Sequence, residues 1–346
     1  MKRVLLTGAG GFIGHHCLRY FLEKTDWFVV CLDSFRHKGT YSRLEEVRLD
    51  PDRVLVLRHD LSVPIDEALE NRILGRTMSD AGPRNEKLDI VINMASDSAV
   101  ERSVSDPAHC WRNNCELALN MLEFARRTKP DVFYQVSSDE VYGDCPEGYS
   151  HPEWDVIAPS NPYAASKAAQ EALAISYFRT YDVPVVITNT MNTIGMCQDK
   201  EKFLPKIIWK VATGQKMEIY ADPLTDGAFH IGSRFYLHAE NHADAFVWLS
   251  GRPPARYSQG ARRPDRYNVV GDVELNNLEF AQMVAEVMGM PLNYELKCSE
   301  SARPGYDRRY ALDGSLLRDM GWKPPIGFRD GLEKIVKWTL DHPWWV

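Results

Sequence analysis

The sequence lacks long hydrophobic runs, paired cysteines and an excess of basic residues. Apolar runs such as Val29–Leu32 and Pro184–Ile187 are far shorter than a membrane span. The seven cysteines are odd in number and form no Cys-x-x-Cys pair, which favours reduced thiols and a cytoplasmic location over a disulfide framework. The formal net charge of -7 argues against a nucleic-acid-binding surface. We therefore expect a globular protein whose partners include neither a membrane nor a nucleic acid.

What is present is a glycine-rich turn between two predicted strands, residues 3–7 and 27–32. Its spacing, G-x-x-G-x-x-G, lets the backbone approach a pyrophosphate at the N-terminus of the helix that follows. The second strand ends at Asp33, where a carboxylate would accept hydrogen bonds from both hydroxyls of a ribose. Because a 2′-phosphate would meet that negative charge, the pattern predicts NAD rather than NADP, although Arg36 and Lys38 lie close by and weigh against this preference. The predicted pyrophosphate-binding residues are Gly8, Gly11, Phe12, Ile13 and Gly14.

Two more apolar stretches, residues 54–57 and 89–93, continue the alternation of strands and helices. Such alternation predicts an α/β fold of Rossmann type, with a parallel, doubly wound sheet that binds its ligand at the carboxyl ends of the strands. Asp60 follows the third strand and is predicted to contact the adenine amino group, with a helix N-cap as its alternative role. Leu61 and Ala95 complete the predicted cofactor-binding set.

A further predicted strand, residues 131–136, ends just before Ser138, Asp139 and Glu140. Residues that leave a central parallel strand at its carboxyl end point toward the ligand, so a hydroxyl and two carboxylates would be delivered to one place. Adjacent residues on a regular strand face opposite ways, so the chain must already turn at Asp139 for both carboxylates to reach the same ligand. A solvated surface turn is the alternative setting for such a pair.

Tyr163 and Lys167 lie four residues apart at the start of a predicted helix. Residues at this spacing share one helix face. The lysine ammonium and the oxidised nicotinamide are expected to lower the pKa of the phenol, which then takes a proton from a hydroxyl as hydride leaves the carbon. The spacing alone is weak evidence, because Tyr20 and Lys24 share it in the first helix. A proline-bounded turn before Tyr163, and Ser138 one strand earlier, set this pair apart.

The set of Ser138, Tyr163 and Lys167 resembles that of the extended short-chain dehydrogenase/reductase family, in which Ser/Thr, Tyr and Lys carry hydride chemistry. The finer resemblance is to the dTDP-glucose 4,6-dehydratases. It covers nearly the whole chain, and the pair Asp139 and Glu140 is its most discriminating element. The stretches that carry it are Ser138–Asp144, Asn161–Lys167, Glu201–Pro205, Arg303–Asp313 and Trp338–Trp345.

The resemblance implies a reaction and a role for each residue. Tyr163 would deprotonate the C4 hydroxyl of a nucleotide-bound hexose as hydride passes to NAD. Glu140 would then remove the acidified hydrogen on C5, and Asp139 would protonate the C6 hydroxyl as it leaves as water. Return of the hydride to C6 gives a 4-keto-6-deoxy sugar and restores NAD. Ser138 stands where the family usually has threonine, and serine can make the same hydrogen bonds.

We expect residues 1–190 to form the NAD-binding domain, with returning segments near 235–260 and 308–320, and residues 191–346 to form mainly a smaller sugar-binding lobe. The chain departs from the family's pattern at Ala99 and at Tyr306, where the family carries histidines, and in a longer segment between Tyr220 and Arg234. The base and the sugar therefore stay open. The residues that the resemblance places against the nucleotide sugar are Ser98, Asn192, Lys202, Arg234, Asn268, Arg303 and Tyr306.

Two alternatives remain. A decarboxylase or C4-epimerase of the same family shares the Tyr-Lys pair but needs no acid at Asp139. A regulator that binds NAD(H) without turnover would have no use for an activated phenol at Tyr163. His238 and His242 lack the His-Glu-x-x-His order and a third ligand, so we expect no metal and place them at the start of a helix near Glu240.

The helices predicted near residues 107–128 and 163–181 carry apolar residues on more than one face, which exceeds what packing on a sheet requires. The family resemblance implies that these helices pair across a two-fold axis. We therefore expect a homodimer.

Overall fold

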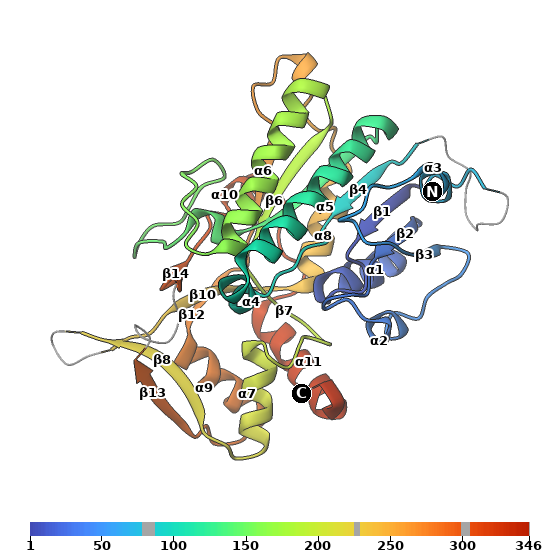
Figure 1. Ribbon diagram of the computed structural model, residues 1–346. Helices are drawn as coiled ribbons and strands as arrows, with labels where there is room; N and C mark the ends of the chain where they lie inside the picture. Colours follow the sequence, from blue (N-terminus) through green and yellow to red (C-terminus); the bar gives the residue numbers. More distant parts are fainter. Residues whose placement is uncertain (78–86, 225–228, 299–304, 346) are drawn as a thin grey trace.

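The computed structural model describes residues 1–77, 87–224, 229–298 and 305–345. Its larger unit is a seven-stranded parallel sheet with the order β11-β6-β5-β4-β1-β2-β3 (Figure 1). The order reverses between β1 and β4, which creates a topological switch point at the carboxyl ends of the strands. The predicted doubly wound fold is confirmed. The strands are β1 (Arg3–Thr7), β2 (Phe28–Asp33), β3 (Val54–Arg58), β4 (Ile90–Asn93), β5 (Val132–Ser138), β6 (Val185–Thr190) and β11 (Asp265–Val269).

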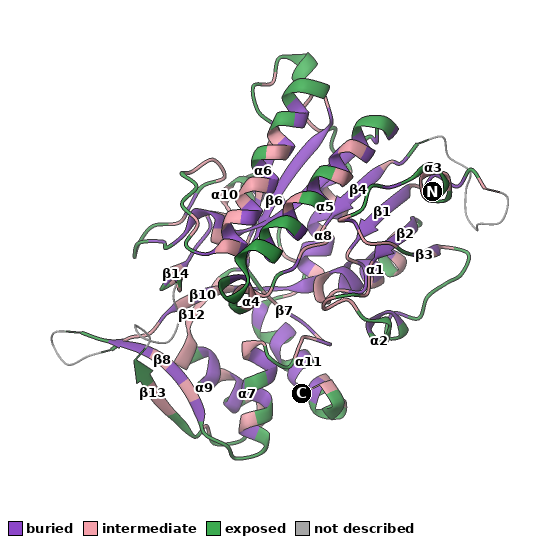
Figure 2. Ribbon diagram, viewed as in Figure 1, coloured by how far each residue is buried: buried purple, intermediate pink, exposed green. Residues whose placement is uncertain are grey.

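Helices cover both faces of this sheet. Side chains of α1 and α8 pack with one face of the strands, and side chains of α3, α5 and α6 pack with the other. Every residue of β1 and β2 is buried, as Figure 2 shows for the sheet's centre, which is what near-continuous apolar runs in parallel strands predict. The helices of this unit are α1 (Phe12–Lys24), α2 (Tyr41–Glu45), α3 (Glu67–Ile73), α4 (Val100–Ser105), α5 (Pro107–Thr128), α6 (Pro162–Tyr181), α8 (Ala239–Leu249) and α10 (Ser315–Asp319).

The two long helices α5 and α6 lie side by side, and each begins with a polar cap followed by proline. Asp106 accepts a hydrogen bond from the His109 N–H, and Asn161 accepts one from the Ala164 N–H. Such caps satisfy backbone donors that the first helical turn leaves unpaired, and proline suits the first position because its missing N–H would be unpaired there anyway. No helix of the described segments is long and apolar enough to cross a membrane.

A smaller lobe lies beside the carboxyl ends of the large sheet and has its own apolar core (Figure 1). One of its sheets has the order β12-β10-β14, with β7 paired to β10, and the other has the order β13-β8-β9. Its strands are β7 (Asn192–Ile194), β8 (Met217–Pro223), β9 (Phe229–His230), β10 (Ser233–His238), β12 (Val273–Asn276), β13 (Tyr294–Cys298) and β14 (Arg309–Tyr310). Its helices are α7 (Phe203–Ala212), α9 (Asn277–Met288) and α11 (Phe328–Asp341).

The chain returns to the large sheet at slightly different places from those expected. Helix α8 lies within the expected returning segment 235–260, but the seventh strand, β11, follows it at residues 265–269, which the sequence analysis left to the lobe. In the second expected segment, β14 joins the lobe, and only α10 packs against β11. Short polar stretches between these elements hide the change of unit in the sequence.

Candidate active site

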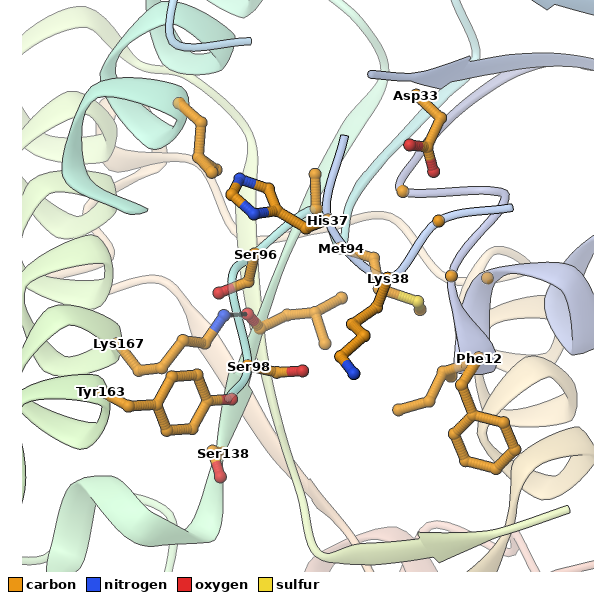
Figure 3. Close-up of a pocket in the computed structure, with 18 of the residues that line it drawn as sticks. Phe12, Asp33, His37, Lys38, Met94, Ser96, Ser98, Ser138, Tyr163 and Lys167 are labelled. Atoms are coloured by element: carbon orange, nitrogen blue, oxygen red, sulfur yellow. Dashed lines mark hydrogen bonds between the residues drawn. The ribbon is translucent and has the colours of Figure 1, made fainter. Parts of the chain in front are cut away.

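A cavity of about 410 Å³ lies at the switch point, at the carboxyl ends of the central strands. It is bounded on one side by the glycine turn and on the other by the start of α6 (Figure 3). The structure brings every predicted catalytic and cofactor residue to it. These are Gly8, Gly11, Phe12, Ile13, Gly14, Asp33, Asp60, Leu61, Ala95, Ser138, Asp139, Glu140, Tyr163 and Lys167.

The glycine turn is packed so closely that side chains would not fit within it. Gly8 has φ +71°, and a Cβ on Gly14 would lie 2.1 Å from the Gly8 carbonyl oxygen. The N-cap of α1 is Gly11, which offers no side-chain cap, so the helix presents its first-turn N–H groups and the positive end of its dipole at the cavity. This geometry fits a pyrophosphate.

Asp33 is positioned by the backbone around it. Its Oδ2 accepts the Gly10 N–H at 2.9 Å and its Oδ1 accepts the Phe35 N–H at 2.8 Å, which leaves one lone pair on each oxygen for a ribose diol. Burial raises the pKa of this carboxyl, and the backbone hydrogen bonds partly offset that. A Cβ on Gly39 would lie 2.6 Å from Oδ1, so glycine keeps this approach open.

The two nearby cations are each paired with a carboxylate. The guanidinium of Arg36 pairs with Asp60 and donates to Asn113 Oδ1 at 2.7 Å, and Lys38 pairs with Glu201 at 2.6 Å. Asp60 also accepts the N–H and hydroxyl of Ser62, so it closes a local turn rather than capping a helix.

Three buried hydroxyls that line the cavity have no hydrogen-bond partner within the described ranges. Buried polar atoms are normally hydrogen-bonded, so these orphan groups are the expected signature of a polar ligand. Together with the glycine turn and Asp33, they fit a dinucleotide. The hydroxyls are those of Ser96, Ser137 and Thr190.

The two carboxylates predicted to be catalytic, Asp139 and Glu140, lie where β5 ends. Strand β5 stops at Ser138, and a 3-10 helix, η1 (Asp139–Tyr142), begins at the next residue, so both carboxylates line the cavity. The turn that the sequence analysis required at Asp139 is therefore present. Asp139 Oδ1 accepts the Ser138 hydroxyl at 2.9 Å, and Oδ2 has no partner among the described residues. Burial, and then the charge of Glu140, raise the pKa of Asp139 to about 7, so this carboxyl retains its proton well above the usual range.

Asn161 was not predicted as a functional residue, yet it joins two parts of the site. Its Oδ1 caps α6, and its Nδ2 donates to Glu140 Oε2 at 3.1 Å. Burial raises the pKa of Glu140, and this hydrogen bond is the largest opposing effect because it favours the carboxylate. Asn161 thus holds Glu140 against the helix that carries Tyr163. Its position before a proline was the signal that could have revealed it.

The environment of Tyr163 corrects one expectation. Burial raises the pKa of the phenol, and the charges of Glu140 and Asp139 raise it further, so the net shift is upward and not downward as predicted. The Lys167 ammonium instead donates to the Val136 carbonyl at 2.6 Å and to Gln170 Oε1 at 2.9 Å. Burial lowers the pKa of Lys167 to about 8. Burial and these two carboxylates therefore favour the protonated phenol.

A line of buried amides fixes Lys167 from behind. Gln170 Oε1 accepts both the lysine and the Gln135 amide at 3.1 Å, and Gln135 in turn accepts the Asn93 amide at 2.9 Å. The Thr7 hydroxyl donates to Asn93 at 3.0 Å, which connects α6 through β5 and β4 to β1. No sequence signal pointed to this network, because each member is an isolated polar residue within an apolar strand or helix.

The seven predicted sugar-binding residues differ in where the structure places them. Ser98, Asn192 and Lys202 line the cavity, and Lys202 is the N-cap of α7. Arg303 lies outside the described residues. The remaining three, Arg234, Asn268 and Tyr306, do not line the cavity.

The side chains of Asn268 and Arg234 donate hydrogen bonds to backbone carbonyls within the protein. The Asn268 amide is fully buried and donates to the carbonyls of His151 and Asp313, both at 3.0 Å, so the structure gives it a structural contact in place of the predicted nucleotide contact. The Arg234 guanidinium donates to backbone carbonyls, lies over the Tyr306 ring at 5.2 Å, and lowers the pKa of Glu140 by its charge. Its position supports the carboxylates rather than a phosphate.

Within the described residues, His238 and His242 do not belong to a group with metal-ligand spacing. His238 caps α8 with its side chain, as expected near Glu240, and burial lowers the pKa of His242 to about 3. The described segments hold one group with metal-ligand spacing, namely His37, Asp97 and His109. The Arg102 guanidinium already lies there, 2.5 Å from Asp97, so we assign no metal to it.

Comparisons with known proteins agree with this geometry. Residues 4–269 match the model of the NAD dependent epimerase/dehydratase family. A dTDP-glucose 4,6-dehydratase of Haemophilus influenzae is 33% identical, with 98% of each chain covered. The low-salt glycan biosynthesis protein Agl12 of Haloferax volcanii is 31% identical over 97% of this chain and 98% of its own. The crystal structure of a dTDP-glucose 4,6-dehydratase from Streptomyces venezuelae, solved with NAD bound, superposes with a TM-score of 0.81 at 28% identity over 99% of this chain and 98% of that one.

Proposed function

The chain belongs to the NAD-dependent epimerase/dehydratase family, and from this premise we propose that it is a 4,6-dehydratase of a nucleoside-diphosphate hexose. The observation that carries the proposal is the turn at Asp139, which presents two adjacent carboxyl groups, Asp139 and Glu140, to the same cavity as Tyr163 and Lys167. Full-length relatives that are themselves named dTDP-glucose 4,6-dehydratases support it.

The cofactor's residues are those of the glycine turn, with Asp33 on the ribose. NAD held by these residues would supply the acceptor for the C4 hydride and the donor that returns it to C6. Tyr163 takes the proton of the C4 hydroxyl, and the buried Lys167 provides the neighbouring positive charge. Both side chains lie on one face of α6, whose start is fixed by Asn161.

The two carboxylates divide the dehydration. Glu140, whose carboxylate form the Asn161 amide favours, takes the proton from C5 of the 4-ketone. Asp139, with a pKa of about 7, gives its proton to the C6 hydroxyl as water leaves. The proton on Glu140 then returns to C5. This division follows the two environments, because one carboxyl has an amide donor and the other has a free, buried oxygen.

Incubation of the purified protein with dTDP-, UDP-, GDP- and CDP-hexoses tests the proposal. We expect one of them to lose a water and gain the ultraviolet absorbance of a 4-keto sugar in alkali. Conversion to a C4 epimer, or loss of carbon dioxide from a uronate, would assign the chain to the alternative reactions of its family. Absence of any conversion in the presence of NAD would favour a regulator that only binds the cofactor.

The first prediction concerns the cofactor. Because a 2′-phosphate would lie against Asp33, NAD should bind on the order of a hundredfold more tightly than NADP. Replacement of Asp33 with alanine should weaken the binding of NAD, since the ribose loses its hydrogen-bond acceptor. The difference between the affinities for NAD and NADP should therefore become smaller. Fluorescence titration of cofactor-free protein measures both affinities. Tighter binding of NADP than of NAD to the unaltered protein would contradict the role given to Asp33.

We further propose a cytoplasmic homodimer. All seven cysteines are free, as is typical of that compartment. Helix α5 exposes Trp111 by 48% and Leu119 by 41%, beside an exposed Val104 on α4, which is more apolar surface than a helix facing water usually carries. Light scattering at micromolar concentration should therefore give twice the 39.5 kDa mass of one chain. A monomer would contradict the predicted pairing of helices α5 and α6 across a two-fold axis.

A further inference from the structure

Two segments line the cavity from opposite units of the protein. The first segment, residues 33–39, is the end of β2 with the loop that follows it; it belongs to the cofactor side and begins with Asp33. The segment that follows β7, residues 197–202, leads into α7 and carries Lys202 on the nucleotide-sugar side. Their relative position decides where a sugar lies against the cofactor.

One guanidinium joins the two segments. Arg43, on the short helix α2, is only 1% exposed. Its Nε donates to the Cys197 carbonyl at 2.9 Å, one terminal nitrogen pairs with Asp199 at 3.1 Å, and the other donates to the Lys38 carbonyl. Its planar fork also lies over the ring of Trp345, at 5.5 Å from the centroid. Arg43 does not itself line the cavity, so any effect on a ligand passes through these partners.

The segment that Arg43 contacts contains a strained backbone conformation. Cys197 has φ +57°, a left-handed conformation that is costly for a residue with a side chain and persists only where neighbours fix it. The Arg43 Nε bonds the carbonyl of this very residue. Two residues on, the Asp199 carbonyl accepts the Lys202 N–H at 2.8 Å and so sets the start of α7.

We infer that Arg43 is a positioning residue that fixes the nucleotide-sugar segment, and with it Lys202, against the loop that binds the cofactor's ribose. The pair Lys38–Glu201 links the same two segments at the surface, but both side chains are about half exposed and such pairs contribute little. The buried link is therefore the decisive one. The inference rests on the proposed function in one respect, namely that Lys202 contacts the nucleotide's diphosphate.

Arg43→Gln tests it with two readouts. Without the fork, the strained segment relaxes, so KM for the accepted nucleotide hexose should rise on the order of tenfold while kcat at saturation changes less than about threefold, since Asp139, Glu140 and Tyr163 keep their places. Calorimetry of the NAD-loaded protein with dTDP and with UDP should show a similar weakening for the nucleotide that the unaltered protein prefers. Arg43→Lys should restore little, because an ammonium is a single point charge and lacks the planar fork whose separate nitrogens reach the three acceptors.

Arg53→Gln is the matched control. Arg53 is also an arginine that donates to backbone carbonyls, those of Phe21, Leu22, Thr25 and Trp27, but it lies at the amino end of the sheet, away from the cavity. It should lower the midpoint of thermal unfolding without raising KM. Asp199→Asn removes one arm of the link and should raise KM by a smaller factor in a protein that keeps the other contacts of Arg43.

Equal KM values in the Arg43→Gln and Arg53→Gln variants, or an unchanged KM in Asp199→Asn if Arg43→Gln does not fold, would overturn the inference. A fall in kcat without a change in KM or in nucleotide affinity would overturn it as well. An unaltered protein that binds dTDP or UDP but makes no 4-keto sugar would overturn the proposed function alone, because the binding comparison between variants does not need turnover.

Discussion

Tyr163→Phe should reduce turnover of the nucleotide hexose by about 10²–10⁴-fold, because it removes the phenol that the proposed mechanism assigns to the C4 proton. The phenol lies at the start of α6 beside Ser138, and its ring is retained by phenylalanine, so the cavity keeps its shape (Figure 3). Mixing the variant with sugar in a stopped-flow spectrophotometer should give no absorbance of reduced cofactor, since the proton and the hydride must leave together.

Tyr177→Phe provides the comparison on the same helix. Tyr177 is also buried, and its hydroxyl donates to Glu123 at 2.5 Å, but it lies far along α6 from the cavity. This variant loses one hydrogen bond, which costs about 1 kcal/mol of stability, and should keep its turnover. Reduced cofactor forming at an unaltered rate in Tyr163→Phe would show that another group accepts the proton.

The cofactor half of the site could be predicted because its chemistry depends on backbone conformation. A pyrophosphate requires glycines at fixed spacing, and Asp33 must end the next strand, so both leave a trace in the sequence. The pair Asp139 and Glu140 was found for a similar reason, as it directly follows a buried strand. The predicted direction of the Tyr163 pKa shift was wrong, because the effects of burial and of two nearby carboxylates depend on distances that a sequence does not contain.

The sugar half was harder because its residues act through long-range packing. Asn268 lies in β11, and only the structure shows that its amide donates to two backbone carbonyls on neighbouring segments. Arg43 stands in a polar stretch that gives no signal, yet it is buried against a segment more than 150 positions away. Arginines of this kind look like surface residues until the fold is known.

Glu140→Gln and Asp139→Asn should separate two consecutive steps that the unaltered protein performs without a pause. In Glu140→Gln, Tyr163 still works, so the C4 hydroxyl is oxidised, but the C5 proton has no acceptor. Reduced cofactor should then accumulate together with a 4-keto sugar that keeps its C6 hydroxyl. Rapid quenching and mass spectrometry measure both species.

In Asp139→Asn the base is intact and the acid is missing. Water loss should slow by about 10²–10⁴-fold, while exchange of the C5 hydrogen with deuterated solvent continues. The pH dependence should change too. Burial and the charge of Glu140 hold the pKa of Asp139 at about 7, so water loss in the unaltered protein should fall as pH rises through that value and the acid is deprotonated. Asparagine does not titrate, so this alkaline limb should disappear from the variant.

Glu153→Gln serves as the control for both variants, because Glu153 is likewise raised in pKa by burial but accepts the Asn268 N–H outside the cavity. This control variant should perform both the C5 deprotonation and the water loss, and its rate of water loss should still fall as the pH rises through about 7. A C4-epimerase or decarboxylase would instead depend little on Asp139 and would never release water from the hexose. Because each carboxylate is assigned to one step, complete dehydration by a protein carrying both Asp139→Asn and Glu140→Gln would refute both assignments. The turn at the end of β5 would then lose its catalytic meaning, and with it the main structural reason for preferring a dehydratase over its relatives.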